Sequence, residues 1–287
     1  MSDGGGRVVS LAARARRAVG EVILVGAGPG DPELITVKGA RALARAEAVV
    51  YDSLVDPALL ELAPPQAARF FVGKRKGRHA ASQEAIGRLL VRLARQGLTV
   101  VRLKGGDPLV FGRGGEELDC LVAAGIPWQV VPGVTAATAC AAAAGIPLTH
   151  RDWAAGVTFL TAHRREGALA LPWELACHPE QTVAFYMGLS VAAELARALM
   201  ARGRRPETPV AVIARASRPE ERILIATLGT LEEELARARL ESPALILVGE
   251  VVRARSARAF ALTTEAAAAP APPPRRGGRR SGCPAAG

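Results

Sequence analysis

Short apolar runs alternate with amphipathic stretches along most of this chain. In its first half, apolar runs bounded by glycine, proline or charged residues predict buried strands. These strands are expected at 21–25, 48–51, 69–72, 99–103 and 128–131. Apolar residues at helical spacing between the runs predict helices at 32–46, 82–96 and 116–124. Such an alternation of strand and helix predicts a doubly wound, mostly parallel sheet.

The alternation resumes after an alanine-rich helix predicted at 135–144. Strands are then predicted at 157–161, 182–186, 210–213, 222–227 and 244–248, and helices near 190–201 and 230–239. We therefore expect an α/β protein with two α/β domains and mostly parallel sheets. The expected parts are a basic flexible arm (1–18), an N-terminal α/β domain with two glycine-rich loops (19–133), a connecting helix and linker (134–156), a C-terminal α/β domain (157–262) and a disordered Pro/Ala/Arg tail (263–287).

The first glycine-rich loop, Gly26-Ala27-Gly28-Pro29-Gly30-Asp31, follows the first predicted strand. Its position is that of a dinucleotide-binding loop, and Asp52 lies about 20 residues later, where a ribose-binding acid is expected. However, the spacing is Gly-x-Gly-x-Gly, and Pro29 and Pro32 remove backbone donors that a pyrophosphate needs. The loop therefore favours a ligand with few phosphates or none.

The second loop, Lys104-Gly105-Gly106-Asp107-Pro108, follows the strand predicted at 99–103. Ligands of doubly wound sheets bind beyond the carboxyl ends of the strands, so both loops are expected at one edge. Paired glycines permit close backbone approach to a flat ligand, and Asp107 can accept hydrogen bonds from a ribose or an ammonium group. Together the loops predict a cofactor site.

The distribution of charge alters what the overall composition suggests. A formal charge of +10 suggests a nucleic-acid partner, but residues 1–18 carry +3 and residues 266–287 carry +4, which leaves only +3 for the rest. We therefore expect solubilising tails and no nucleic-acid partner. No apolar run is long enough to span a membrane. The four cysteines have neither CxxC nor zinc-finger spacing, which predicts no metal site and favours free thiols in the cytoplasm.

Eight segments in order carry a resemblance to a known family. They are 25–32, 50–55 (Val-Tyr-Asp-Ser-Leu-Val), 72–75 (Val-Gly-Lys-Arg), 102–117, 131–136 (Val-Pro-Gly-Val-Thr-Ala), 145–152 (Gly-Ile-Pro-Leu-Thr-His-Arg-Asp), 185–188 (Phe-Tyr-Met-Gly) and 243–250. The chain resembles the tetrapyrrole methylases, and within them the members that methylate uroporphyrinogen III. The resemblance covers residues 21–255.

The resemblance implies an architecture, a cofactor and a partner. The architecture is that of a class III methyltransferase, with a cleft between two α/β domains and usually a homodimer. The implied cofactor is S-adenosyl-L-methionine, which becomes S-adenosyl-L-homocysteine. The residues implied to bind it are Pro29, Gly105, Gly106, Asp107, Val110, Thr135, Ala136, Met187 and Ala216. The family usually has Asn-Gly-Thr where this chain has Arg215-Ala216-Ser217, so the contact at Ala216 requires a negative φ there.

The implied reaction is transfer of two methyl groups, from uroporphyrinogen III to precorrin-1 and then to precorrin-2, toward sirohaem and cobalamin. An electron-rich pyrrole carbon attacks the sulfonium methyl directly, so alignment supplies much of the acceleration. The ring must then lose a proton; the resemblance makes Asp52 the candidate base and Lys74 the candidate proton donor. Arginine matches the carboxylates of such a substrate. The candidate substrate ligands are Arg75, Arg78, Arg113 and Arg151.

Other functions stay open from sequence alone. A related enzyme acting on a later precorrin would share the sheet plan and the cofactor loops. The segments around Asp52, Lys74 and Arg151 favour uroporphyrinogen III. The loop prolines disfavour an NAD-dependent oxidoreductase, and the weakly charged centre of the chain disfavours an RNA-modifying protein with basic tails. Because the first strand begins near residue 21, we expect no upstream oxidation domain and a product no further than precorrin-2.

Overall fold

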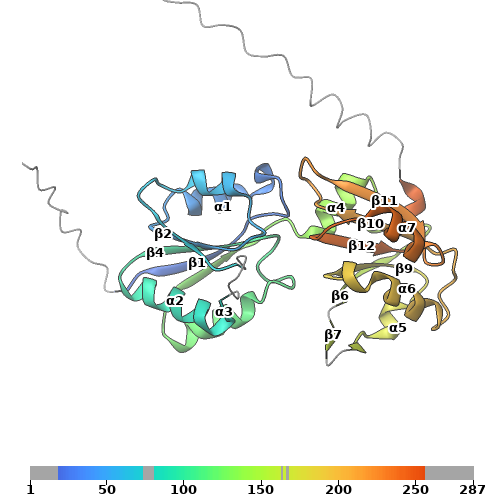
Figure 1. The fold of residues 1–287 in the computed structure, drawn as a ribbon. Helices are drawn as coiled ribbons and strands as arrows, with labels where there is room; N and C mark the ends of the chain where they lie inside the picture. The colour runs from blue at the N-terminus through green and yellow to red at the C-terminus, as the bar shows by residue number, and fades with distance from the viewer. Residues whose placement is uncertain (1–18, 74–80, 163, 166–167, 256–287) are drawn as a thin grey trace, which may run out of the picture. The chain divides into compact units, whose positions relative to one another are not determined.

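The computed structural model describes residues 19–73, 81–162, 164–165 and 168–255 (Figure 1). The first five-stranded sheet has the order β3-β2-β4-β1-β5. Its strands are β1 (Glu21–Gly26), β2 (Ala48–Tyr51), β3 (Ala68–Phe71), β4 (Thr99–Lys104) and β5 (Trp128–Val131). The helices that accompany it are η1 (Pro32–Leu34), α1 (Val37–Leu43), η2 (Pro57–Leu62), α2 (Gln83–Arg95) and α3 (Gly114–Ala123).

Every strand pair in this first sheet is parallel, as the strand and helix alternation predicts. Figure 1 shows α1 on one face and α2 with α3 on the other. Ile23 and Val25 of β1 lie in the core on the α1 face, whereas Val22 and Leu24 pack with α2. Burial on both faces explains why these strands are almost continuously apolar.

The second five-stranded sheet has the order β11-β10-β12-β9-β6. Its strands are β6 (Gly156–Thr161), β9 (Gln181–Tyr186), β10 (Pro209–Ala214), β11 (Arg222–Thr227) and β12 (Ala244–Val248). Only β6 and β9 pair in parallel; the other three pairs are antiparallel. The prediction of mostly parallel pairing was therefore wrong for this sheet. The loop 215–221 between β10 and β11 is a short hairpin connection, which cannot carry the crossover that parallel neighbours need.

The remaining elements complete the second half of the chain. They are α4 (Ala136–Ala144), β7 (Arg164–Arg165), β8 (Ala168–Leu169), α5 (Trp173–Ala176), η3 (Leu189–Val191), α6 (Ala192–Met200), α7 (Leu231–Ala238) and η4 (Glu250–Ala254). The pattern of apolar residues predicts α4, α6 and α7, but β7, β8 and α5 are too short to show a periodicity. Among the described helices, none is long and apolar enough to cross a membrane.

The helix predicted at 32–46 is divided into η1 and α1. Asp31 caps η1, since its side chain accepts a hydrogen bond from the Glu33 amide. The backbone is then extended at Ile35 and Thr36, and the Thr36 hydroxyl accepts a bond from the Gly39 amide. A continuous helix was therefore the wrong prediction, because Thr36 acts as the N-cap of a second helix.

Three glycines bring the carboxyl ends of β1, β4 and β5 into contact. A Cβ added to Gly133 would lie 2.3 Å from the Gly106 oxygen and 2.7 Å from the Gly26 Cα. Gly106 has a φ of 68°, which favours glycine. Its amide donates to the Gly28 oxygen at 2.7 Å, and the Gly28 amide donates back at 3.2 Å. These bonds place the two glycine-rich loops together at one edge of the sheet, as predicted.

Replacing Gly133 with alanine should strain this junction, because the new methyl group would meet backbone atoms that cannot rotate away. We expect Gly133→Ala to lower the free energy of unfolding by about 1–3 kcal/mol in urea titrations. Gly115→Ala is the matched control, since a Cβ there meets nothing within 4 Å. Equal stability of the two variants would contradict the close approach of the three strand ends.

Candidate functional site

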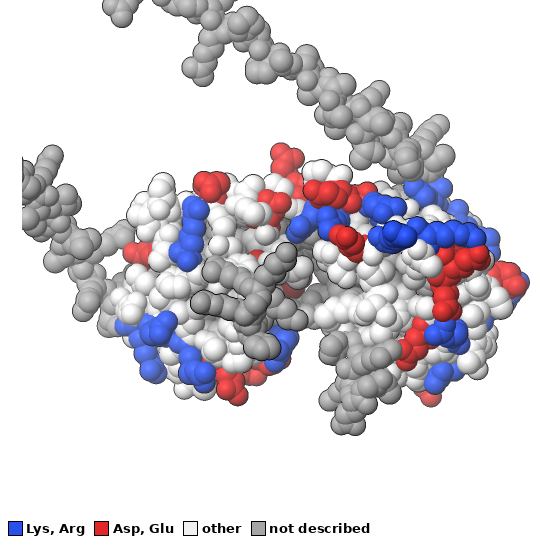
Figure 2. Space-filling model, viewed as in Figure 1, with Lys and Arg blue, Asp and Glu red and all other residues white. Residues whose placement is uncertain are grey.

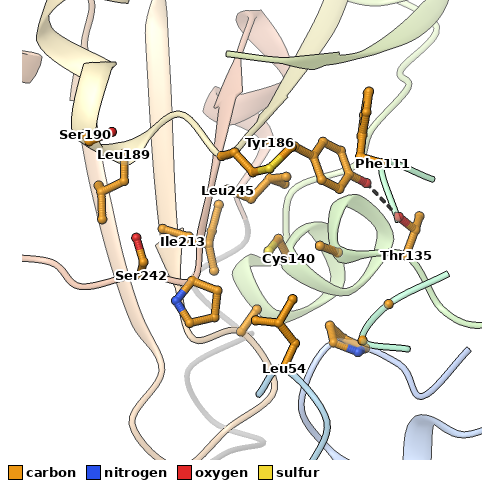
Figure 3. Close-up of a pocket in the computed structure, with 18 residues that line it drawn as sticks. Leu54, Phe111, Thr135, Cys140, Tyr186, Leu189, Ser190, Ile213, Ser242 and Leu245 are labelled. Carbon is orange, nitrogen blue, oxygen red and sulfur yellow. Dashed lines mark hydrogen bonds between the residues drawn. The ribbon is translucent and has the colours of Figure 1, made fainter. Parts of the chain in front are cut away.

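A cavity of about 380 Å³ lies beyond the carboxyl ends of β1, β4, β5 and β9 (Figure 3). It is lined by seven of the nine residues that the resemblance implies for the cofactor. They are Pro29, Gly105, Gly106, Thr135, Ala136, Met187 and Ala216. Segments far apart in the sequence thus converge on one space of the size that small-molecule sites occupy.

Asp107 and Val110 do not line this cavity. The two carboxylate oxygens of Asp107 accept hydrogen bonds from the Leu109 amide at 2.8 Å and the Gly133 amide at 3.0 Å. Val110 packs against the apolar cluster that contains α4. Asp107 therefore connects the loop after β4 to the segment after β5. Its side chain holds the cavity wall in place without contacting the cavity itself.

The loop after β10 contacts the first glycine-rich loop. Ala216 has no positive φ; the left-handed conformation falls on Arg215 (51°) and Ser217 (61°) instead. The Asp31 amide donates to the Ser217 hydroxyl at 3.1 Å, and Arg218 Nη2 donates to the Leu54 oxygen at 2.8 Å. The condition for a backbone contact at Ala216 is thus met despite the missing glycine.

Sequence reasoning missed Tyr186, which lies at the end of β9 on the cavity wall. Its hydroxyl is 2.7 Å from the Thr135 Oγ1 and accepts a bond from the Ala137 amide at 3.1 Å. Burial raises the pKa of Tyr186, so the hydroxyl stays neutral. The available signal was an aromatic residue at the end of an apolar strand, beside Met187.

The cavity wall is mostly apolar, and among the described residues no lysine or arginine lines it. Its polar side chains are hydroxyls, such as those of Thr135, Tyr186 and Ser242. A pyrophosphate requires cations or a row of free amides, so this lining disfavours a dinucleotide. It suits a ligand that carries a base and a ribose without phosphates. The fold and the cavity therefore define a protein that binds a nucleoside-like cofactor at the edge of a parallel α/β sheet.

Asp52 lies just outside the cavity, after β2. Its Oδ2 accepts a hydrogen bond from Arg102 Nη2 at 3.2 Å, and its Oδ1 accepts one from the Leu54 amide at 3.1 Å. Leu54 lines the cavity, and a Cβ added to Gly105 would lie 2.5 Å from the Leu54 Cβ. The carboxylate is thus fixed beside the cavity without being part of its wall, which a ribose-binding acid would have to be.

Behind Asp52 lies a buried charged cluster, Arg102, Lys104 and Glu117, which the half-buried amide of Gln83 joins and which sequence reasoning did not single out. Glu117 Oε1 accepts bonds from Lys104 Nζ at 2.9 Å, Arg102 Nε at 3.2 Å and Gln83 Nε2 at 2.9 Å. Burial, and then the charge of Arg102, lowers the pKa of Lys104. Two cations at alternate positions of an otherwise apolar strand were the signal for a buried acidic partner.

The candidate substrate ligands are only partly described. Lys74, Arg75 and Arg78 lie outside the described residues. Arg113 is exposed and holds Glu116 with two bonds of 2.8 and 2.7 Å, which raise the pKa of Arg113 and lower that of Glu116. Arg151 is exposed, and its guanidinium makes no hydrogen bond or ion pair within the described parts of the chain. Neither arginine lines the cavity, so any substrate contact lies outside the cofactor space.

Comparisons with known proteins agree with this geometry. The family model for tetrapyrrole (corrin/porphyrin) methylases matches residues 21–232. The chain belongs to this family. It is 51% identical over 250 residues to a siroheme synthase from Azotobacter vinelandii, an alignment that covers 87% of this chain and 54% of that protein. The chain thus spans about half the length of the curated relatives it matches.

Two solved structures are also similar. One is uroporphyrin-III C-methyl transferase from Thermus thermophilus complexed with S-adenyl homocysteine, with 42% identity, a TM-score of 0.70, and coverage of 82% of this chain and 94% of that one. The other is a cobalt precorrin-4 methyltransferase, with 31% identity, a TM-score of 0.72, and coverage of 81% and 95%. The TM-scores of the two structures are nearly the same, whereas the sequence identity to the first, 42%, is higher than the 31% to the second.

Removing the Tyr186 hydroxyl should loosen the start of α4 at the cavity wall. We expect Tyr186→Phe to lower the free energy of unfolding by about 1 kcal/mol and to weaken S-adenosyl-L-homocysteine binding several-fold, because the Ala137 amide and Thr135 lose a partner. Chemical denaturation and calorimetric titration would measure both effects.

The matched control is Tyr51→Phe, which removes the other tyrosine hydroxyl of the chain. The Tyr51 ring packs edge-on against Phe71, and its hydroxyl makes no hydrogen bond to the described residues. We expect this control to leave both quantities close to wild type. If the two variants behave alike, the Tyr186 hydroxyl does not organise the cavity.

Proposed function

We propose that this chain is an S-adenosyl-L-methionine-dependent C-methyltransferase that converts uroporphyrinogen III to precorrin-1 and then to precorrin-2. The observation that carries the proposal is the cavity at the carboxyl edge of the parallel sheet, with Asp52 fixed beside it. Similarity to a uroporphyrin-III C-methyl transferase along 94% of that chain supports the substrate. Membership of the methylase family supports the reaction.

The cofactor site fits S-adenosyl-L-methionine by its chemistry. When bound, this cofactor supplies a methyl group activated by its sulfonium. Gly105 and Gly106 present bare backbone to a flat group, and the positive φ of Gly106 turns the loop there. Thr135 and Tyr186 supply neutral hydroxyls. An apolar wall around these groups excludes water from the reacting methyl.

Asp52 is the proposed base on the substrate side of the site. After methylation the ring carries a positive charge and must release a proton. The two hydrogen bonds from Arg102 and Leu54 fix the plane of the Asp52 carboxylate and leave further lone pairs free to accept that proton. Lys74 is the proposed proton donor.

The acidic side groups of the substrate are proposed to bind Arg75, Arg78, Arg113 and Arg151. Arg113 already holds a carboxylate, that of Glu116, with both edges of its guanidinium. A substrate carboxylate would replace Glu116 in the same two-bond geometry. Arg151 offers an exposed guanidinium without such competition in the described structure.

Two alternatives are less well supported. A later precorrin as substrate would agree with the similarity to the cobalt precorrin-4 methyltransferase. However, the chain is 31% identical to that protein and 42% identical to the uroporphyrin-III C-methyl transferase. An RNA-modifying role would require a basic surface. On the face in view in Figure 2, basic and acidic side chains are interspersed.

We further propose that the chain works in the cytoplasm as a homodimer. The free thiols of Cys120, Cys140 and Cys177 suit a reducing compartment. The homodimer is the assembly that the resemblance to other tetrapyrrole methylases implies.

The decisive assay is incubation with uroporphyrinogen III and labelled S-adenosyl-L-methionine, followed by mass analysis. We expect two added methyl groups. Asp52→Asn should lower kcat by about 10²-fold or more, because the amide cannot accept the proton. Asp56→Asn is the matched control, since the Asp56 side chain only caps η2 by accepting from the Ala58 amide.

The outcomes separate the candidate functions. No methyl transfer despite S-adenosyl-L-methionine binding would overturn the substrate assignment, and transfer to a later corrinoid instead would favour the alternative enzyme. An Asp52→Asn variant as active as the control would remove Asp52 from the proton chemistry.

A further inference from the structure

The side chain of Glu117, in the first half of α3, is completely buried, with 0% exposure. A carboxylate at such a site is costly unless cations and hydrogen bonds compensate it. Compensation here is concentrated on one oxygen, Oε1, which accepts from Arg102, Lys104 and Gln83. So much buried charge in the core of a small sheet calls for a reason beyond stability, because apolar residues would pack there at lower cost.

Two of the three donors come from β4, the strand that ends at the cavity wall, and the third comes from α2. Gln83 is the first residue of α2, and Lys104 is the last residue of β4, immediately before Gly105 on the cavity wall. Arg102 lies two residues earlier on β4 and reaches the end of β2. A single oxygen atom therefore joins α2, α3 and β4 at the edge where the site is built.

The Arg102 guanidinium connects Glu117 to Asp52. Its Nε donates to Glu117, its Nη1 donates to the Leu103 oxygen at 2.9 Å, and its Nη2 donates to Asp52 at 3.2 Å. Because the guanidinium is planar and its donors have fixed directions, holding Nε and Nη1 also fixes the direction of Nη2. The Asp52 carboxylate is then held between Nη2 and the Leu54 amide.

We propose that Glu117 is a positioning residue for Asp52, and that it acts by fixing the Arg102 guanidinium that orients the Asp52 carboxylate toward the tetrapyrrole. Lys104 pairs with Glu117 beside Arg102, so that two carboxylates, Asp52 and Glu117, face two cationic side chains. This inference rests on the proposed role of Asp52 as the base. It adds Glu117, Arg102 and Lys104 to the groups on which the rate depends, although none of them needs to touch the substrate.

The test uses a charge-balanced variant so that folding is preserved. Glu117→Gln keeps the size of the side chain but leaves Lys104 without its anion. In Glu117→Gln/Lys104→Met one anion and one cation are removed together, and Arg102 still faces Asp52. Glu84→Gln is the matched control, because Glu84 also lies in the first turn of a helix but is exposed and, within the described residues, pairs with Arg88 alone.

A positioning role predicts a particular pattern of kinetics. The charge-balanced variant should bind S-adenosyl-L-homocysteine within twofold of wild type, and its kcat with uroporphyrinogen III should fall by about tenfold or more. In an Asp52→Asn background the same two changes should lower kcat by less than twofold, because Glu117 acts only through Asp52. A merely structural role would instead reduce kcat by the same factor in both backgrounds, which would overturn the proposal.

Amide hydrogen exchange gives a readout that does not depend on activity. Exchange of the Leu54 amide, which donates to Asp52, should accelerate in the charge-balanced variant and not in Glu84→Gln. Unchanged exchange at Leu54 would overturn the proposal even if kcat fell. If the wild-type chain methylates no tetrapyrrole, the proposed function fails, and the exchange measurement still decides whether Glu117 orders the Asp52 turn.

Discussion

The site depends on the pairing of the buried Glu117 carboxylate with Arg102 and Lys104, beneath the edge of a parallel sheet. An unpaired charge at that depth would cost several kcal/mol, so Glu117 requires Arg102 and Lys104, and they require it. None of the three is tolerable alone in an apolar core. Their mutual dependence fixes the end of β4 relative to α3, and through Arg102 it also fixes Asp52. The position of Asp52 beside the cavity is thus fixed by charged side chains that pair inside the core.

The sheet topology provides the second constraint. Parallel strands end at a common edge, and the contacts among Gly26, Gly106 and Gly133 bring three of these ends together without side chains between them. The second half of the chain then adds Tyr186 and Ala216 to the same cavity. The result is an apolar space with neutral hydroxyls, and beside it a fixed carboxylate, Asp52, which we propose accepts the proton that the substrate releases.

Much of the fold could be predicted from the sequence, wherever a local pattern of apolar residues determines the secondary structure. The apolar runs predict every strand of the first sheet, and its parallel pairing follows from the intervening helices. Pairing in the second sheet could not be predicted in the same way, because the direction of a neighbour depends on connections rather than on the strand itself. The break at Thr36 was missed because its hydroxyl caps a new helix inside an otherwise helical pattern. Seven of the nine cofactor residues that the resemblance implied line the cavity, whereas Tyr186 and Glu117 owe their roles to contacts across long sequence separations.

If the cofactor occupies the cavity and Asp52 lies outside it, the two regions should respond differently to substitution. Calorimetric titration with S-adenosyl-L-homocysteine measures this response in the wild type, in Ala136→Leu, which fills the cavity, and in Asp52→Asn. We expect Ala136→Leu to abolish binding and Asp52→Asn to leave the Kd unchanged. Normal binding by Ala136→Leu, or an equal loss of affinity in Asp52→Asn, would contradict this placement of the cofactor.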